Sequence, residues 1–184
     1  METPKNLLKA MAGESLARNK YTYFAEQAEK EGLIWISRVF LETADNERAH
    51  AEEEFEQIRE KVEMTNTYGI DPQGTTLENL RQAAAGEKFE YTEMYPGFKK
   101  IAQEEDNEKA ARLFQEISEV EEKHEERYNK LADLLESGKL YQSDKEIEWK
   151  CLNCGYIHRG TSAPEKCPLC QKPQGWYMGI GIVR

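Results

Sequence analysis

Two glutamate–histidine pairs with the spacing Glu-x-x-His are the residues best suited to chemistry. They are Glu47 with His50 and Glu121 with His124, each in an acidic stretch free of glycine and proline. Counting upstream from Glu47 in steps of three and four residues reaches Phe40, which is the spacing of a core-facing helical side. Each pair is therefore predicted to point a carboxylate and an imidazole into the interior of a helical protein.

Glu14 and Glu87 extend this pattern to two further helices, in which a mostly apolar seam is interrupted near its middle by the glutamate. A buried unpaired carboxylate costs several kcal/mol, and four of them in one layer would also repel one another. A pair of multivalent cations can neutralise them, and glutamate with neutral histidine suits iron or manganese. One glutamate from each of two helices plus Glu-x-x-His from each of two others is the ligand set of ferritin-like di-iron bundles.

The two pairs belong to an internal repeat. When Phe40 is aligned with Phe114, the segments FLETADNERAH and FQEISEVEEKH share Phe, Glu, Glu and His at the same places. The two AGE triplets that end at Glu14 and Glu87 follow this alignment with a shift of one position. A lone Glu-x-x-His is more often part of a solvated surface, but two copies in register with two further glutamates favour a metal site. The repeat predicts a pseudo-symmetric bundle of two helical hairpins.

The repeat is imperfect at Glu90, which lies three residues beyond Glu87 on the same helical face, whereas its counterpart in the first hairpin is Ala17. The pseudo-symmetry places this extra carboxylate near the metal served by His50. Two interpretations remain open. That metal could exchange Glu90 for His50 as its charge changes, or Glu90 could be an outer or exposed residue.

Cysteines suggest a second metal site near the end of the chain, where two C-x-x-C motifs are separated by twelve residues. In a cytosolic chain this clustering favours a metal over disulfides. Four thiolates in tetrahedral geometry suit zinc or a single iron, and the spacing alone favours a structural zinc. The four residues are Cys151, Cys154, Cys167 and Cys170.

The neighbours of these cysteines point towards a redox metal instead. Small residues next to the sulfurs leave backbone N–H groups accessible, and Trp149, Tyr156 and Trp176 could keep the site dry. Such features tune the potential of a metal, although they also pack a small core. His158 is expected to be a surface residue, with modulation of the potential or contact with an electron donor as the alternative.

Four helices must position the glutamates and histidines. We expect Thr3 to cap the first helix, Thr75 and Glu78 to form a capping box at the third, and Asp106 to cap the fourth. Pro96 should kink or interrupt the third helix. The stretch TNTYGIDPQG (residues 65–74) is the clear long loop of this part. These signals predict a four-helix bundle over residues 1–137, a linker over 138–148 and a small metal-held module over 149–184.

The composition limits the function classes. Charged residues make up 33% of the 184 residues and the net charge is −10, which argues against nucleic acid as the main partner. No apolar run approaches the roughly 20 residues needed to span a bilayer. The first residues lack the apolar stretch and cleavage site of a signal peptide. We therefore expect a cytoplasmic protein with no membrane segment.

Taken together, these motifs resemble the rubrerythrins over essentially the whole chain. The resemblance is carried by AGESLARNKYTYFAEQAEKEG, ETADNERAHAEE, AAAGEKFEYTEMYPGF, EEKHEERY and the cysteine motifs. It implies a mainly α protein, with a ferritin-like di-iron four-helix bundle followed by a β-rich rubredoxin-like domain that holds one Fe(Cys)4 centre. By position, the implied di-iron ligands are Glu14, Glu47, His50, Glu87, Glu90, Glu121 and His124.

The resemblance also implies a function. Rubrerythrins resemble non-haem di-iron peroxidases that reduce hydrogen peroxide to water in oxidative-stress defence. Electrons would pass from an NAD(P)H-linked reductase or a rubredoxin through the Fe(Cys)4 centre to the di-iron site. One iron would move between Glu90 and His50 with redox state, and two chains would form a head-to-tail homodimer. Tyr21 and Tyr95 match tyrosines near the family's site and would hydrogen-bond peroxide or the carboxylates, or else serve as core aromatics.

Two other function classes remain open. The bundle could be an iron-oxidising or iron-binding protein in which the cysteines hold a structural zinc. It could also be a di-iron protein that reduces or activates dioxygen. Storage would require a cage, in which a fused redox module has no obvious task. A hydroxylase should have a sizeable apolar substrate pocket, which no sequence feature demands.

Overall fold

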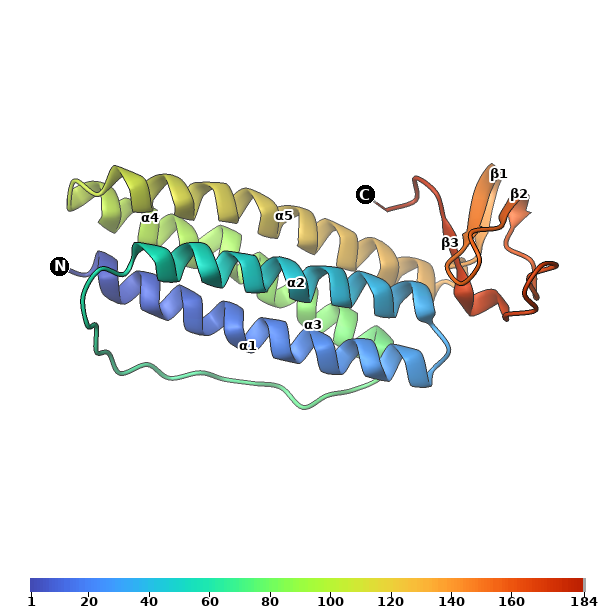
Figure 1. The fold of residues 1–184 in the computed structure, drawn as a ribbon, viewed down its shortest axis with the longest axis horizontal. Coiled ribbons are helices and arrows are strands. Elements are labelled where there is room, and N and C mark those ends of the chain that lie inside the picture. Colours follow the sequence, from blue (N-terminus) through green and yellow to red (C-terminus); the bar gives the residue numbers. More distant parts are fainter. Residues whose placement is uncertain (184) are drawn as a thin grey trace.

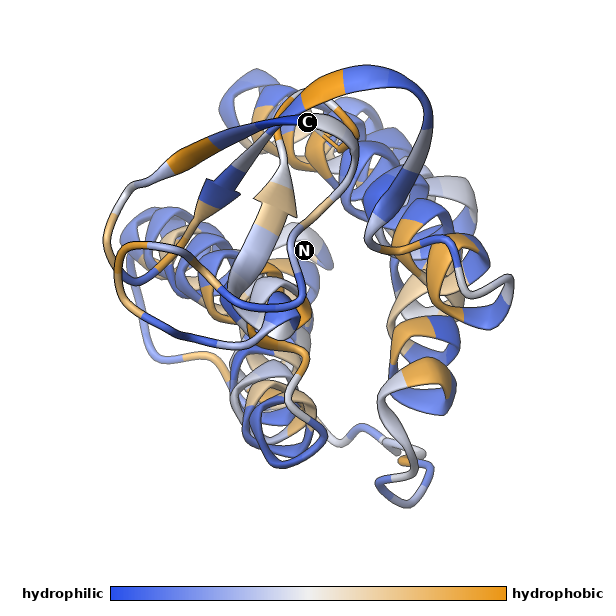
Figure 2. Ribbon diagram, turned by 90° about the vertical axis from the view of Figure 1, so that its right-hand side faces the viewer, coloured by the Kyte–Doolittle hydropathy of each residue, from blue (hydrophilic) through white to orange (hydrophobic). Residues whose placement is uncertain are grey.

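Amphipathic helices build most of the chain. The computed structural model describes residues 1–183. In this part the α-helices are α1 (Thr3–Lys30), α2 (Ile34–Gln57), α3 (Thr76–Phe89), α4 (Tyr95–Glu104) and α5 (Glu108–Glu136). They lie side by side in a long bundle with a small β-rich module at one end (Figure 1). Seen from the end that carries the module, apolar and polar residues alternate along each helix (Figure 2). The predicted fold class is confirmed.

A long connection sets the direction of the helices. Residues 58–75 form no helix or strand, and they run along the whole bundle beside α1 (Figure 1). Because of this crossover, α3 runs in the same direction as α2, and the pair α1–α2 lies beside the pair formed by α3–α4 and α5. A bundle with one long crossover connection is the ferritin-like topology. None of the helices in the described part is long and apolar enough to cross a membrane.

The third helix is interrupted between α3 and α4 by a π-helical segment, η1 (Glu90–Met94). Pro96 lies in the first turn of α4, where its missing N–H is tolerated. A π turn takes up one more residue than an α turn. This extra residue explains why the repeat offset is one position longer between Tyr21 and Tyr95 than between Glu14 and Glu87.

Only some of the helix starts have the capping residues that the sequence predicts. The capping box of Thr75 and Glu78 is present at α3. The predicted cap at Asp106 is wrong, because Asp106 has a left-handed backbone with φ of 57°. Asn107 caps α5 instead, and its side chain accepts a hydrogen bond of 3.1 Å from the backbone N–H of Ala110.

A distant carboxylate caps α1 in place of the predicted Thr3. Thr3 is already the first helical residue, and no side chain at the cap position bonds the helix. The two oxygens of Glu105 instead accept backbone N–H groups, at 2.6 Å from Glu2 and 2.9 Å from Thr3. These hydrogen bonds lower the pKa of Glu105 from 4.5 to about 2. The start of α1 is therefore tied to the end of α4.

We expect Glu105→Gln to lower the thermal unfolding temperature at neutral pH, because an amide can accept only one of the two hydrogen bonds. Since the pKa of Glu105 is depressed in the folded state, its contribution is present above pH 4.5 and is lost as the pH falls through about 2. The difference between variant and wild type, measured by circular dichroism, should shrink over that range. Glu104→Gln, at the neighbouring exposed glutamate, is the control. A difference independent of pH would contradict the capping role.

The C-terminal module is a small antiparallel sheet. Its strands are β1 (Gln142–Cys151), β2 (Ile157–Ser162) and β3 (Tyr177–Gly179), with β1 in the centre, and a short 3-10 helix, η2 (Gln174–Trp176), precedes β3. β1 begins inside the predicted linker, because residues from Gln142 onwards pair with β2. The predicted end of the module, Arg184, lies outside the described residues.

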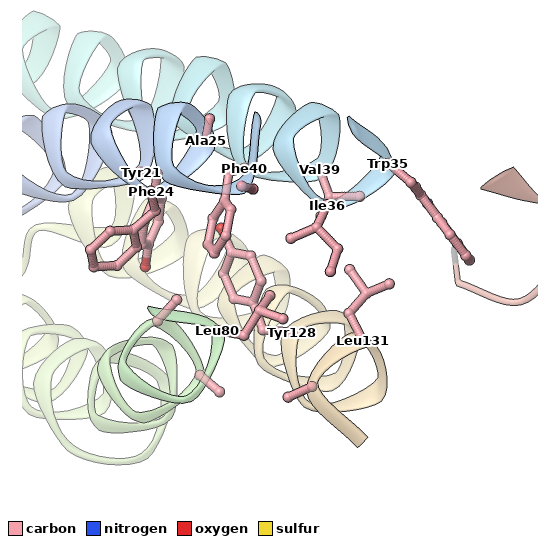
Figure 3. Close-up of a cluster of buried hydrophobic side chains, with 14 of the residues drawn as sticks. Tyr21, Phe24, Ala25, Trp35, Ile36, Val39, Phe40, Leu80, Tyr128 and Leu131 are labelled. Carbon is pink, nitrogen blue, oxygen red and sulfur yellow. The ribbon is translucent and has the colours of Figure 1, made fainter. Parts of the chain in front are cut away.

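The module is seated on the end of the bundle formed by the α1–α2 turn. Leu152, Met178 and Ile182 pack against the bundle core that contains Trp35, which lies at the end of that cluster in Figure 3. At Gly175 a Cβ would come within 1.8 Å of the carbonyl oxygen of Gly32. Only glycine therefore fits at this contact between the module and the bundle.

Two hydrophobic clusters fill the bundle interior on either side of its middle. One lies towards the module and contains Tyr21, Phe40 and Tyr128 (Figure 3). The other lies towards the opposite end and contains Leu7 and Phe114. The buried glutamates predicted from the sequence lie between these clusters along the helices, so that the apolar layers shield them from both ends.

Candidate metal centres

Six of the predicted side chains gather in the middle of the bundle. Glu14, Glu47, Glu87 and Glu121 are each at most 1% exposed and come from four different helices. Their ligand atoms fall into two groups, within each of which all ligand atoms lie within 4.8 Å of one another. The first group is Glu14, Glu47, His50 and Glu121, and the second is Glu47, Glu87, Glu121 and His124.

Glu47 and Glu121 belong to both groups because each spans the two histidines. Nδ1 of His50 lies 3.0 Å from one oxygen of each glutamate. Nδ1 of His124 lies 2.7 Å from the other oxygen of Glu121 and 3.4 Å from the other oxygen of Glu47. Each of these carboxylates thus offers one oxygen to each side. This is the arrangement by which a carboxylate bridges two adjacent cations.

Several of these atoms lie close together without the geometry of a hydrogen bond. Both oxygens of Glu121, one oxygen of Glu14, one of Glu47 and Nδ1 of His124 are buried without a hydrogen bond among the described residues. Buried polar atoms are rarely left unpaired, because each costs about 1–3 kcal/mol. Oxygen and imidazole donors that converge in this way fit a pair of hard or borderline cations such as iron or manganese.

The electrostatics of the cluster favour positive charge. The pKa values of Glu14 and Glu87 are raised well above their usual range, first by burial and then by the neighbouring carboxylates. Burial alone would lower the pKa of His50, but the carboxylates of Glu121 and Glu47 raise it to about 10. The same two carboxylates raise the pKa of His124 to about 9 against the effect of burial. The carboxylates therefore favour the positively charged form of both histidines.

Two tyrosines hold the outer glutamates across the pseudo-symmetry. Tyr21 donates a hydrogen bond of 2.5 Å to Glu87, and Tyr95 donates one to Glu14. Each tyrosine of one hairpin thus contacts the glutamate of the other. Both are fully buried, so that each hydroxyl is a fixed donor at the edge of the cluster.

Glu90 lies outside both groups of four. It is partly exposed at the first residue of η1. Desolvation by the surrounding protein, followed by repulsion from Glu121 and Glu47, raises its pKa to about 8, whereas Lys20 and His50 act in the opposite direction. The exchange of Glu90 and His50 on one metal remains a proposal.

Glu54 was not predicted from the sequence. It is 0% exposed, lies seven residues after Glu47 on α2, and has one carboxyl oxygen 3.0 Å from the hydroxyl oxygen of Tyr95. Its second oxygen is buried without a partner among the described residues. The signal that could have identified it is helical phase, because a seven-residue step returns to the face that carries Glu47.

The four cysteines form the second centre. Their sulfur atoms lie within 4.8 Å of one another, and Sγ–Sγ distances are 3.7 Å for Cys151–Cys170 and 3.6 Å for Cys154–Cys167. A disulfide requires about 2.0 Å. The edge of a tetrahedron with metal–sulfur bonds of about 2.3 Å is about 3.8 Å long, which fits a single ion bound by four thiolates.

Backbone amides and aromatic rings surround these sulfurs. The N–H of Lys172 lowers the pKa of Cys170. Trp149 is fully buried beside the cysteines, whereas Tyr156 and Trp176 are partly exposed. His158 lies on β2 opposite Trp149 and is partly exposed.

Comparison with known proteins finds two matched regions in the chain. Residues 5–132 match the family model described as rubrerythrin. Residues 149–177 match the model described as the rubredoxin-like domain of rubrerythrin.

Curated relatives and solved structures are similar over nearly the whole chain. A rubrerythrin from Nitratidesulfovibrio vulgaris is 45% identical over 98% of this chain and 95% of its own length. Rubrerythrin-1 from Clostridium acetobutylicum is 44% identical over 96% of this chain and 93% of its own. The fully reduced, all-ferrous state of nigerythrin superposes with a TM-score of 0.67 at 35% identity, covering 96% of this chain and 86% of that one.

Proposed function

The chain belongs to the rubrerythrin family, and we propose that within this family it is a peroxidase that reduces hydrogen peroxide to water. The family combines a carboxylate and histidine di-iron site with a four-cysteine rubredoxin-like site, and both sets of residues are present here. We further propose that the protein acts in oxidative-stress defence in the cytoplasm. The iron ligands would be Glu14, Glu47, His50, Glu87, Glu90, Glu121 and His124 in the bundle and Cys151, Cys154, Cys167 and Cys170 in the module.

One observation carries the proposal. Glu47 and Glu121 each present one oxygen to either histidine, so that two cations would sit side by side between the same two carboxylates. When bound as ferrous ions, such a pair supplies together the two electrons that reduction of the O–O bond requires. The protein surrounds this position with negative charge, which compensates the additional positive charge of the oxidised state.

Tyr21 and Tyr95 are the proposed catalytic side chains. Their hydroxyl groups are buried and directed at Glu87 and Glu14, next to where a small substrate would bind. A phenol at this position can orient peroxide by hydrogen bonding and hand over a proton as an oxygen atom leaves as water. Burial, with nearby carboxylates, raises the pKa of both phenols well above the usual value. Both therefore stay protonated and able to donate.

A pocket beside the crossover connection offers a route for peroxide. It has a volume of about 400 Å³ and is lined by Ala17, Lys20, Glu90 and Met94 together with residues 66–70. Glu90 is the ligand candidate that reaches this pocket. A substrate as small as hydrogen peroxide needs no larger opening.

Electrons would come from a reduced pyridine nucleotide through a reductase or rubredoxin and then the Fe(Cys)4 centre. The module contacts the bundle near Trp35, twelve residues before Glu47 on α2, which corresponds to about 18 Å along the helix. Apolar core of this length separates the module from the glutamate cluster within one chain. This separation supports a head-to-tail homodimer, in which the module of one chain passes electrons to the bundle of its partner.

The proposal is tested with anaerobically purified, fully reduced protein of known iron content. Hydrogen peroxide is added to one sample and dissolved oxygen to another, and the return of the Fe(Cys)4 absorbance is followed by stopped flow. We expect fast return with peroxide and slow return with oxygen. Faster return with oxygen would favour a dioxygen reductase. Native protein with zinc in the cysteines would have no internal electron path, and iron oxidation would then be the better assignment.

A further inference from the structure

The pseudo-symmetry of the bundle has an exception at Glu54. The alignment that relates Glu47 to Glu121 and His50 to His124 also relates Glu54 to Tyr128. On one side of the bundle Tyr128 packs edge-on against Tyr21, with ring centroids 5.5 Å apart. At the equivalent place on the other side, the carboxyl group of Glu54 contacts a tyrosine hydroxyl.

Hydrogen bonding around Tyr95 requires an additional proton. Its hydroxyl oxygen lies within hydrogen-bond distance of one oxygen of Glu14 and one of Glu54. A phenol has one proton and can donate to only one of them. The other carboxyl group must therefore be protonated and donate to the phenol oxygen. When Glu14 binds a cation it is ionised and accepts from Tyr95, which leaves the proton on Glu54.

The surroundings of Glu54 agree with a neutral carboxylic acid. The side chain is 0% exposed and no cation pairs with it among the described residues. Burial raises its pKa well above the usual value; the contact with Tyr95 and the charge of His50 oppose this effect, and the carboxylates of Glu90 and Glu121 add to it. The titratable groups that face it from the surrounding helices are Glu14 on α1, His50 on α2, Glu90 on η1, Tyr95 on α4 and Glu121 on α5.

We propose that Glu54 stores a proton and delivers it through Tyr95 to the substrate. This inference rests on the proposed peroxidase function, in which formation of two waters from one peroxide consumes two electrons and two protons. Glu54 does not touch the substrate in this scheme. It acts by returning a proton to Tyr95, so that the proton is donated from the side of the cluster that carries Glu14.

The protons and electrons of this step are balanced. As the O–O bond breaks, the phenolic proton of Tyr95 would move to the oxygen that leaves as water, and a bound, reduced iron pair would supply the two electrons. The proton of Glu54 moves at the same time to the phenol oxygen. Glu54 is left as a carboxylate and regains a proton from solvent before the next turnover, and solvent supplies the second proton of the reaction.

Infrared spectroscopy of the reduced, iron-loaded protein tests where the proton lies, independently of activity. We expect a C=O stretching band of a protonated carboxylic acid at neutral pH that shifts in D2O. The band should be missing in Glu54→Gln and retained in Tyr128→Phe, the matched variant at the pseudo-symmetric position. Absence of the band in the wild type would overturn the proposal.

Single-turnover oxidation by peroxide tests what the proton does. We expect Glu54→Gln to slow the reaction on the order of 10²-fold, the lower range for general acid catalysis, and to change its pH profile and solvent isotope effect. Tyr128→Phe should remain within about twofold. Glu54→Asp keeps an acid on a shorter side chain and should restore part of the rate. It also provides the test if Glu54→Gln does not fold.

Three outcomes would overturn the relay. One is an unchanged rate and isotope effect in Glu54→Gln. Another is loss of an iron ion from Glu54→Gln, because Glu54 would then be a ligand. The third is a wild type that carries the acid band but does not react with peroxide. In that case the proposed function fails while the protonation of Glu54 stands, so the two failures are distinguishable.

Discussion

Glu121→Gln is expected to remove iron from both positions of the bundle at once. Glu121 offers an oxygen to each histidine, so its loss weakens two coordination sets. Glutamine has the same shape but only one good acceptor and no charge. Metal analysis should show the bundle iron lost and the Fe(Cys)4 iron retained. Peroxide-driven oxidation should fall by more than the roughly 10–100-fold that is typical for residues outside the coordination sphere.

Two further variants make this result specific. Glu122→Gln changes the neighbouring glutamate, which is exposed, and should keep full iron content and rate. Glu14→Gln changes a residue that belongs to one group only, and should affect one position more than the other. If Glu121→Gln bound as much iron as the wild type, the sharing of this carboxylate between two cations would be wrong.

Cys154→Ser is expected to abolish turnover with NADH and reductase while leaving the bundle reactive. Serine cannot replace a soft thiolate in a tetrahedral S4 site, so the absorbance of the Fe(Cys)4 centre should disappear. The chemically reduced variant should still be oxidised by peroxide in a single turnover, because Cys154 belongs to the module at the end of the bundle, whereas the glutamate cluster lies in the middle of the helices (Figure 1). Steady-state turnover should fall to the background level.

Leu169→Ala is the matched control for the cysteine variant. Leu169 lies between Cys167 and Cys170 and is 67% exposed, so its side chain can be shortened without disturbing the sulfurs. This variant should keep its absorbance and turnover. Steady-state turnover that survives Cys154→Ser would place the module outside the electron path and favour a structural zinc.

The bundle and both centres could be predicted because their signals are repeated or closely spaced. Glu47 and His50 alone would resemble any acidic helix, but their copy at Glu121 and His124 identifies them. The π-helical segment was not predicted, because helix propensity does not separate an α from a π turn. Its only sign in the sequence is that the spacing between equivalent residues of the two hairpins grows by one position between Glu87 and Tyr95.

Other features depend mainly on tertiary contacts. Glu54 follows Glu52 and Glu53, which are exposed, so composition cannot distinguish the buried member of this run. The cap of α1 comes from Glu105, which is distant in the chain and close only in the fold. Tertiary structure decides both the burial of Glu54 and the capping of α1. The sequence gives only a weak signal for the burial of Glu54.

The crossover of residues 58–75 joins two hairpins, each of which supplies only part of both ligand groups. Each group of four ligand candidates draws three side chains from one hairpin and one from the other, Glu121 in the first group and Glu47 in the second. Metal affinity is therefore coupled to the association of the hairpins. The crossover acts as a tether that sets their effective concentration.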